Sequence, residues 1–233
     1  MKNKNLIFIA EIGMNYNGNI DLAFELIKQA KLSGADIAKF QLGWRDKPGE
    51  INNLDKKKIK KLILWGKYFD IEIMFSIISE PALKLINHFD MNKFKVASRT
   101  VKENFSLANK ILSKKKLTFI SLGMWNKKKL PFKKNKYIKY LWCNSKYPTH
   151  IEDLKKLPKN FNKTNYDGFS DHSIGIETCI LAVSRGAEII EKHFTLDKSD
   201  RTIRDHLLSA TPDEFKTMIN ISRDIHKKIK FGV

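Results

Sequence analysis

Short apolar segments alternate along the chain with stretches in which apolar residues recur every three or four positions. The apolar segments are typical of buried parallel strands, and the stretches between them are typical of amphipathic helices. Eight strands are expected, over 6–13, 36–42, 71–77, 94–98, 117–123, 138–145, 166–172 and 188–194. Helices are clearest over 21–33, 56–68, 176–185 and 212–229, and the last follows Thr211 and begins with a proline and acidic residues.

Eight strand–helix repeats in 233 residues predict an α/β fold, a closed (β/α)8 TIM barrel. The barrel is expected to be compact, because 126–136 and 151–157 leave room only for reduced helices after the fifth and sixth strands. No linker or composition shift indicates a second domain, so residues 1–233 are expected to form one domain. An open doubly wound sheet is the alternative that the strand count leaves open.

Lysine dominates the charge of the chain. It accounts for 38 of the 44 cationic side chains, against 25 Asp and Glu, and the formal net charge is +19. The lysines lie in scattered short runs such as 56–58, 114–116 and 127–129. These runs lack the arginine forks and interleaved aromatic residues of nucleic-acid readers. They are interpreted as solvated faces, and nucleic acid is not an expected partner.

The two cysteines, Cys143 and Cys179, provide no disulfide framework, which indicates a reducing compartment. The apolar run over 6–10 ends at Glu11, so it is too short for the core of an export signal. No segment approaches the ~18 consecutive apolar residues of a membrane helix. We therefore expect a cytoplasmic protein that does not contact a membrane.

Polar residues collect where the expected strands end. In a TIM barrel, functional residues come from the C-terminal ends of the strands and the loops that follow. The polar positions there are Glu11, Lys39, Gln41, Ser98, Ser121, Asn144, Ser145, 170–172 and 191–193. Any one of them is more often a turn or core residue, but their coincidence at equivalent positions predicts an active site at this rim.

His172 and His193 end neighbouring strands, whose backbones lie about 4.8 Å apart in a sheet. They could share one divalent metal. Two imidazoles with oxygen ligands and open water positions suit Mn²⁺, Fe²⁺, Co²⁺ or Zn²⁺, acting as a Lewis acid on a carbonyl oxygen.

Lys39 has two interpretations. A lysine that points into a barrel can form a Schiff base with a carbonyl substrate, or it can hold a phosphate. Nearby positions supply a second cation and several hydroxyls, at Lys95, Ser98, Ser121, Ser145 and Ser170. That lining favours an anion, and hence the phosphate interpretation.

A series of motifs resembles the N-acetylneuraminate (sialic acid) synthase family, in the order in which the family has them. The motifs are AEIGMN at 10–15, GADIAKFQ at 34–41, YPT at 147–149, GFSDHSIG at 168–175, IEKHFTLD at 190–197 and DH at 205–206. The resemblance covers essentially the whole chain. The catalytic domain of that family is a TIM barrel, in agreement with the strand count.

The resemblance implies condensation of phosphoenolpyruvate with an open-chain aldose or amino sugar, usually N-acetylmannosamine or a relative. The products would be a sialic-acid-like 2-keto acid and phosphate, in surface-carbohydrate biosynthesis. A divalent metal, taken as Mn²⁺, would be held by His172 and His193, and Glu11 matches the catalytic carboxylate. Positions around phosphoenolpyruvate match Lys39, Lys95, Ser98, Ser121, Ser145 and Ser170, and positions around the sugar match Gln41, Tyr147 and Asp205. Among these, Glu11, Lys39 and Asp205 are expected to be catalytic.

The departures from the family pattern fall on the sugar side. After Ser98 the family usually continues to a glutamate that contacts the acceptor, whereas this chain has Arg99 and Thr100. The family's C-terminal antifreeze-like domain, which delivers an arginine into the partner's site, is not found before Val233. We therefore expect an acceptor other than N-acetylmannosamine, with Arg99 or Arg204 as the replacement cation. A homodimer is left open, because family dimers rely partly on that domain.

Two other functions are left open at this stage. One is a catalytically inactive or regulatory barrel that retains ligand binding. The other is an aldolase that forms a Schiff base at Lys39 and needs no metal.

Overall fold

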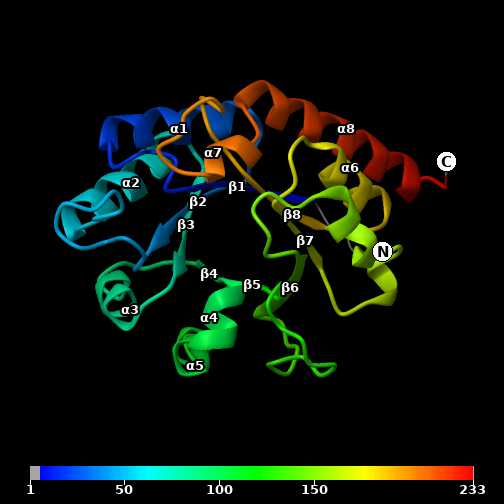
Figure 1. Cartoon of the computed structure of the whole chain (residues 1–233), viewed down its shortest axis with the longest axis horizontal. Helices are drawn as coiled ribbons and strands as arrows, with labels where there is room; N and C mark the ends of the chain where they lie inside the picture. Colours follow the sequence, from blue (N-terminus) through cyan, green and yellow to red (C-terminus); the bar gives the residue numbers. More distant parts are fainter. Residues whose placement is uncertain (1–5, 233) are drawn as a thin grey trace.

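Eight parallel strands close into a barrel in the order in which they occur along the chain (Figure 1). The computed structural model describes residues 6–232. Its strands are β1 (Ile7–Gly13), β2 (Ile37–Leu42), β3 (Glu72–Ile77), β4 (Lys93–Val96), β5 (Leu117–Ser121), β6 (Ile138–Cys143), β7 (Gly168–Asp171) and β8 (Ile189–His193). The predicted TIM barrel is confirmed, and the open sheet is excluded because β8 pairs with β1.

Helices surround the barrel on its outside (Figure 1). They are α1 (Ile20–Leu32), α2 (Lys56–Tyr68), α3 (Glu80–Ile86), α4 (Ser98–Glu103), α5 (Phe105–Leu112), α6 (Glu177–Ser184), α7 (Asp205–Leu208) and α8 (Pro212–Lys230). The four helices expected from periodicity are present, and α3, α4, α5 and α7 are additional. Between β5 and β7 the described chain has only two 3₁₀ turns, Ile151–Lys156 and Phe161–Lys163, so the reduced helices are confirmed.

The longest helix, α8, shows how local chemistry fixes an element. Thr211 and Glu214 form a reciprocal capping box, and Pro212 occupies the first turn, where its missing N–H costs nothing. Phe215 and Met218 lie on the buried face of the helix. The same spacing of apolar residues made this helix predictable from the sequence.

Side chains that face into the barrel form two layers. The lower layer is apolar and is called the plug, and the layer above it, at the C-terminal ends of the strands, forms the floor of the cavity at the mouth of the barrel. Inward-facing apolar residues form a separate cluster inside the barrel: Ile9, Ile37, Met74, Phe119, Leu141 and Ile189. Two residues further along the same strands lie Glu11, Lys39, Ser76, Ser121, Cys143 and Glu191. Since residues i and i+2 of a strand share a face, these side chains also point inward, above the apolar plug.

Asp171 and Lys192 lie outside this mouth, so the expectation that every polar residue of 170–172 and 191–193 faces the rim is wrong for these two. Each falls between two inward-facing neighbours, and the alternation therefore turns it outward, towards the helices. The Lys192 Nζ atom is 2.7 Å from Asp171 Oδ2, and both side chains are fully buried. Asp171 also accepts hydrogen bonds from the backbone N–H and the hydroxyl of Ser173.

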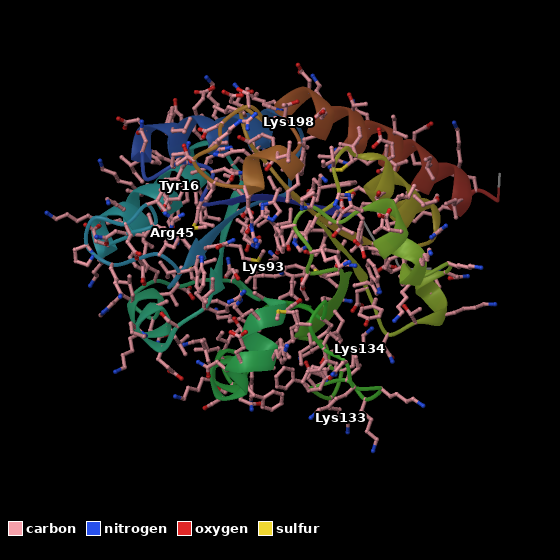
Figure 2. All side chains as sticks on the ribbon, in the orientation of Figure 1. Tyr16, Arg45, Lys93, Lys133, Lys134 and Lys198 are labelled. Atoms are coloured by element: carbon pink, nitrogen blue, oxygen red, sulfur yellow. The ribbon has the colours of Figure 1, made fainter. Side chains whose placement is uncertain are left out.

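The lysines at the surface agree with the interpretation that the positive charge lies on solvent-exposed faces. Lys133 and Lys134 project from the outside of the molecule (Figure 2), in the helix-free segment before β6. Within residues 6–232, none of the helices combines the length and apolar character that crossing a membrane requires. The expectations of one domain over 1–233 and of no export signal also concern residues 1–5 and 233, which lie outside the described residues.

We predict that Lys192→Met lowers the free energy of unfolding by about 3–5 kcal/mol, because it leaves the Asp171 charge buried without its partner. The double variant Lys192→Met with Asp171→Asn removes that charge and is expected to recover part of the loss. Urea unfolding of the three proteins measures both effects. A double variant less stable than Lys192→Met would contradict this account of the pair.

Candidate active site

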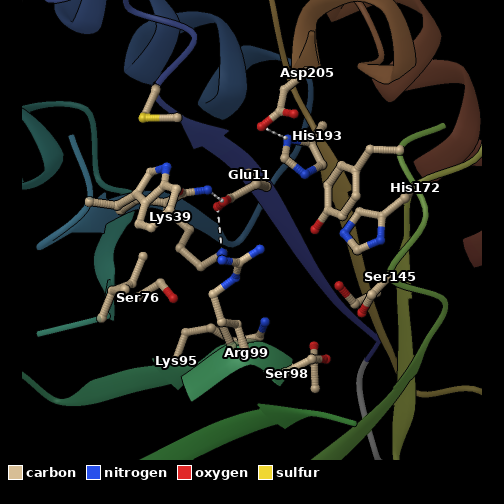
Figure 3. Close-up of a pocket in the computed structure, with 18 of the residues that line it drawn as sticks. Glu11, Lys39, Ser76, Lys95, Ser98, Arg99, Ser145, His172, His193 and Asp205 are labelled. Atoms are coloured by element: carbon tan, nitrogen blue, oxygen red, sulfur yellow. Dashed lines mark hydrogen bonds and ion pairs between the residues drawn. The ribbon is translucent and has the colours of Figure 1, made fainter. Parts of the chain in front are cut away.

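A cavity of about 730 Å³ opens at the C-terminal ends of the strands (Figure 3). All the site residues expected from the sequence line it: Glu11, Lys39, Gln41, Lys95, Ser98, Arg99, Ser121, Ser145, Tyr147, Ser170, His172, His193 and Asp205. Side chains from β1, β2, β4, β5, β7 and β8 meet there, together with loops that follow strands. The structure therefore brings the whole predicted set into one cavity.

Two lysines and two glutamates form a continuous ion-pair network on the floor of the cavity, and all four side chains are buried. The Lys39 Nζ atom is 2.6 Å from Glu11 Oε2 and 3.5 Å from Glu191 Oε2. The Lys95 Nζ atom is 3.0 Å from Glu191 Oε1. Figure 3 shows the side chains of Glu11 and Lys39, from the neighbouring strands β1 and β2, pointing towards each other. The floor thus carries two positive and two negative charges that compensate one another.

The network favours the charged forms of Lys39 and Glu191. Burial alone would lower the pKa of Lys39, but the carboxylates of Glu11 and Glu191 raise this pKa above its usual value. Burial would likewise raise the pKa of Glu191, but Lys39 and Lys95 hold it well below its usual range. Lys39 is therefore an ammonium ion at neutral pH, and Glu191 is a carboxylate.

Serine hydroxyls surround the lysines. The Ser98 hydroxyl accepts a hydrogen bond from the Gly123 N–H at 2.8 Å, so its own proton is available to a ligand. The Ser121 hydroxyl is buried and has no hydrogen-bond partner among the described residues. Ser170 donates to Glu191 at 2.7 Å and thereby supports the network. Together with the lysines, these hydroxyls form a lining that suits an anion.

The two predicted histidines lie side by side, with ring centroids 5.5 Å apart (Figure 3). The Nδ1 atom of His172 is 2.6 Å from the carbonyl oxygen of Asn144, which fixes Nδ1 as the donor and leaves Nε2 with its lone pair. Burial and the neighbouring His193 lower the pKa of His172 to about 3, so this ring is neutral. Tyr147 packs on His172 with ring centroids 4.0 Å apart.

The histidine pair has the donor chemistry of a metal site. The Nδ1 atom of His193 is buried without a hydrogen-bond partner among the described residues, 3.9 Å from Asp205 Oδ2. No group of three or more His, Cys, Asp or Glu suited to a metal occurs within residues 6–232. Two adjacent imidazoles, one of them with an unpartnered ring nitrogen, suit an ion that takes two imidazole ligands and fills its other positions with substrate oxygens and water.

Glu191 was expected among the polar residues at the rim, but the sequence assigned it no role. In the structure it connects Lys39 to Lys95. It stands two residues before His193 on the same strand, and so on the same inward face. Trp44 and Arg45 were not predicted, because they come from the loop after β2, where no periodicity indicates a direction.

Comparisons with known proteins agree with this geometry. Residues 49–233 match the model of the NeuB family. An uncharacterized protein of Methanocaldococcus jannaschii is 34% identical over 99% of this chain and 74% of its own length. The N,N'-diacetyllegionaminic acid synthase of Campylobacter jejuni is 31% identical over 99% of this chain and 79% of its own length. The sialic acid synthetase of Leptospira borgpetersenii superimposes with a TM-score of 0.82 at 28% identity, covering 97% of this chain and 86% of that one.

We predict that both thiols of the native protein react slowly with a thiol reagent. Burial raises the pKa of Cys143 to about 11 and the pKa of Cys179 well above its usual value. At pH 8, roughly one Cys143 in a thousand is then a thiolate. Titration with Ellman's reagent should detect both thiols quickly in urea and only slowly in the native state. Rapid labelling of native Cys143 would contradict its burial beside the site.

Proposed function

The chain belongs to the NeuB family, and we propose that it is a carbon–carbon bond-forming synthase that condenses phosphoenolpyruvate with an open-chain aldose. The products are a sialic-acid-like 2-keto acid and phosphate. The observation that carries this proposal is the buried lysine–glutamate floor, lined by hydroxyls and facing two adjacent histidines. The names of relatives, such as the legionaminic acid synthase, support the class of product.

Phosphoenolpyruvate is proposed to bind on the floor of the cavity. Its phosphate and carboxylate groups are strong acceptors, and the floor offers two ammonium groups with several hydroxyl donors: Lys39, Lys95, Ser98, Ser121, Ser145 and Ser170. The carboxylates of Glu11 and Glu191 lie within ion-pair distance of the two lysines. The ligand thus meets donors that are held in place before it arrives, so little reorganisation is needed.

Bond formation begins at C3 of phosphoenolpyruvate. The enol π electrons attack the aldehyde carbon of the acceptor, the new C–C bond forms, and the aldehyde oxygen becomes a hydroxyl after taking up a proton. Positive charge then develops at C2. Glu11 lies at the end of β1 beside Lys39, and we assign its carboxylate to stabilise that charge and to orient the incoming water.

Water captures C2 and gives up a proton. The resulting tetrahedral centre expels phosphate by cleavage of the bond between C2 and the phosphate oxygen, and its hydroxyl gives its proton to the departing phosphate, which leaves the ketone of the product. Gln41 donates to Glu11 Oε1 at 3.2 Å and holds the carboxylate in the orientation that this step needs. Ser170 acts on the other side of the floor by fixing Glu191.

We assign the divalent metal to His172 and His193, with Mn²⁺ as the expected ion. When bound, it supplies a Lewis acid that polarises the acceptor aldehyde. The hydrogen bond from His172 to the Asn144 carbonyl sets the tautomer of that ring, and Asp205 lies beside His193 and can orient it. Gln41, Tyr147 and Asp205 are proposed to surround the sugar.

The paired state of Lys39 argues against the alternative Schiff-base aldolase. That chemistry needs a neutral amine, whereas the two carboxylates beside Lys39 raise its pKa. The free, buried cysteines Cys143 and Cys179 accord with a reducing, cytoplasmic setting for the proposed reaction.

We predict that the protein releases phosphate from phosphoenolpyruvate only when an aldose acceptor and Mn²⁺ are present. Glu11→Gln is expected to lower kcat by roughly 10²–10⁴-fold, because the change removes the charge that stabilises C2. A coupled phosphate assay across a panel of aldoses measures the phosphate release and kcat, and circular dichroism checks that the variant is folded. Failure of every aldose to release phosphate would favour the inactive, ligand-binding barrel instead.

We predict that His193→Ala weakens Mn²⁺ binding at least tenfold, because one of the two imidazole ligands is lost. Titration calorimetry with MnCl₂ measures this without turnover. His88→Ala is the matched control, since His88 is exposed and lies outside the cavity. Equal Mn²⁺ affinity of His193→Ala and the control would refute the ligand assignment.

A further inference from the structure

Three arginines stand at the mouth of the cavity, above the floor. Arg45 follows β2, Arg99 lies in α4 after β4, and Arg204 follows β8. Within the part of the chain that the structure describes, Arg45 and Arg99 have no ion-pair partner. Arg204 differs from them, because its Nε atom is 3.5 Å from Asp205 Oδ1. The mouth therefore carries positive charge that the protein itself does not compensate, whereas the floor is compensated.

Arg99 is positioned for a ligand. Its guanidinium carbon lies 5.3 Å from the centroid of the Trp44 ring, and Figure 3 shows the side chain extending from α4 over the cavity. Packing against a ring holds the planar guanidinium by its face and leaves the N–H groups at its edge free. Arginine can only donate hydrogen bonds, and its fork of donors matches the paired oxygens of a phosphate or carboxylate.

The position of Arg99 in the barrel separates it from the histidine pair. Its helix follows β4, and β4 is four strands away from β8, which carries His193, in either direction round the barrel. An acceptor with its aldehyde at the histidines would therefore extend towards Arg99 with its far end.

Resting on the proposed function, we propose that the acceptor aldose carries an anionic group, a phosphate or a carboxylate, at the end remote from its aldehyde. Arg99 binds this group, and Arg45 contributes charge from the neighbouring loop. Arg99 thus determines acceptor specificity without touching the reacting carbon atoms.

The competing assignment is that Arg99 binds the phosphate of phosphoenolpyruvate, since it directly follows Ser98. The two assignments differ in which KM responds to a change at Arg99. If Arg99 serves phosphoenolpyruvate, its loss raises the KM of that substrate with every acceptor. If it serves the acceptor, only the KM of charged acceptors rises.

The experiment uses the full chain with phosphoenolpyruvate and Mn²⁺. Mannose and N-acetylmannosamine are each supplied in three forms: neutral, as the 6-phosphate, and as the 6-carboxylate. Phosphate release is measured for the wild type, Arg99→Gln, Arg99→Lys and the control Arg201→Gln. Arg201 is an exposed arginine of the same mouth-forming loop as Arg204, but it does not line the cavity. Calorimetry with the same sugars and phosphoenolpyruvate, with Mn²⁺ left out, measures binding without turnover.

We expect at least one charged form to be used about 10–100-fold more efficiently than its neutral parent, the range of one charge-assisted, bidentate contact. Comparing the efficiency of the 6-phosphate sugars with that of the 6-carboxylate sugars identifies the anion. Arg99→Gln is expected to abolish the preference, Arg99→Lys to restore part of it, and Arg201→Gln to retain it.

Equal use of charged and neutral acceptors by the wild type would overturn the inference and leave the synthase intact. A rise in the KM of phosphoenolpyruvate alone in Arg99→Gln would also overturn it. Charged sugars that bind through Arg99 without any phosphate release would refute the synthase and leave only the anion site. No binding and no release would refute both.

Discussion

The compensation of charge on the floor of the barrel is the constraint on which the rest of the site depends. Four ionisable side chains, Glu11, Lys39, Lys95 and Glu191, are buried together. Isolated buried charges are costly, so each is retained because oppositely charged neighbours lie within ion-pair distance. The network stores donors for an anion in a place from which water is largely excluded. Apolar residues fill the barrel directly below the network, and this packing keeps the network at the mouth.

Much of this arrangement could be predicted from the sequence, because a TIM barrel repeats one geometric rule. Buried strands show as apolar runs, and polar residues at their ends must meet at one rim. The rule correctly placed Glu11, Lys39 and the two histidines in one cavity. It failed where side-chain alternation was not followed residue by residue, as for Asp171 and Lys192, which pair outside the mouth. Applied strictly, the same alternation would have separated the inward-facing Glu191 from the outward-facing Lys192.

The loop after β2 could not be predicted in this way. Trp44 and Arg45 enter the mouth from it, and no hydrophobic period fixes their direction there. Arg204, which was expected at the rim as a replacement cation, does line the cavity. The short helix α4 was hidden because Ser98 reads as a strand end, although it is the first residue of that helix. This start of α4 is what places Arg99 over the cavity.

The central claim is that the floor network binds phosphoenolpyruvate, and calorimetric titration of Lys95→Met with that ligand tests it most directly. The matched control is Lys116→Met, which removes a surface lysine paired with the exposed Asp90. The account predicts at least roughly tenfold weaker binding for Lys95→Met and wild-type affinity for the control, since one charge-assisted contact to the anion is lost. Wild-type affinity of Lys95→Met, with its fold intact by circular dichroism, would contradict the account.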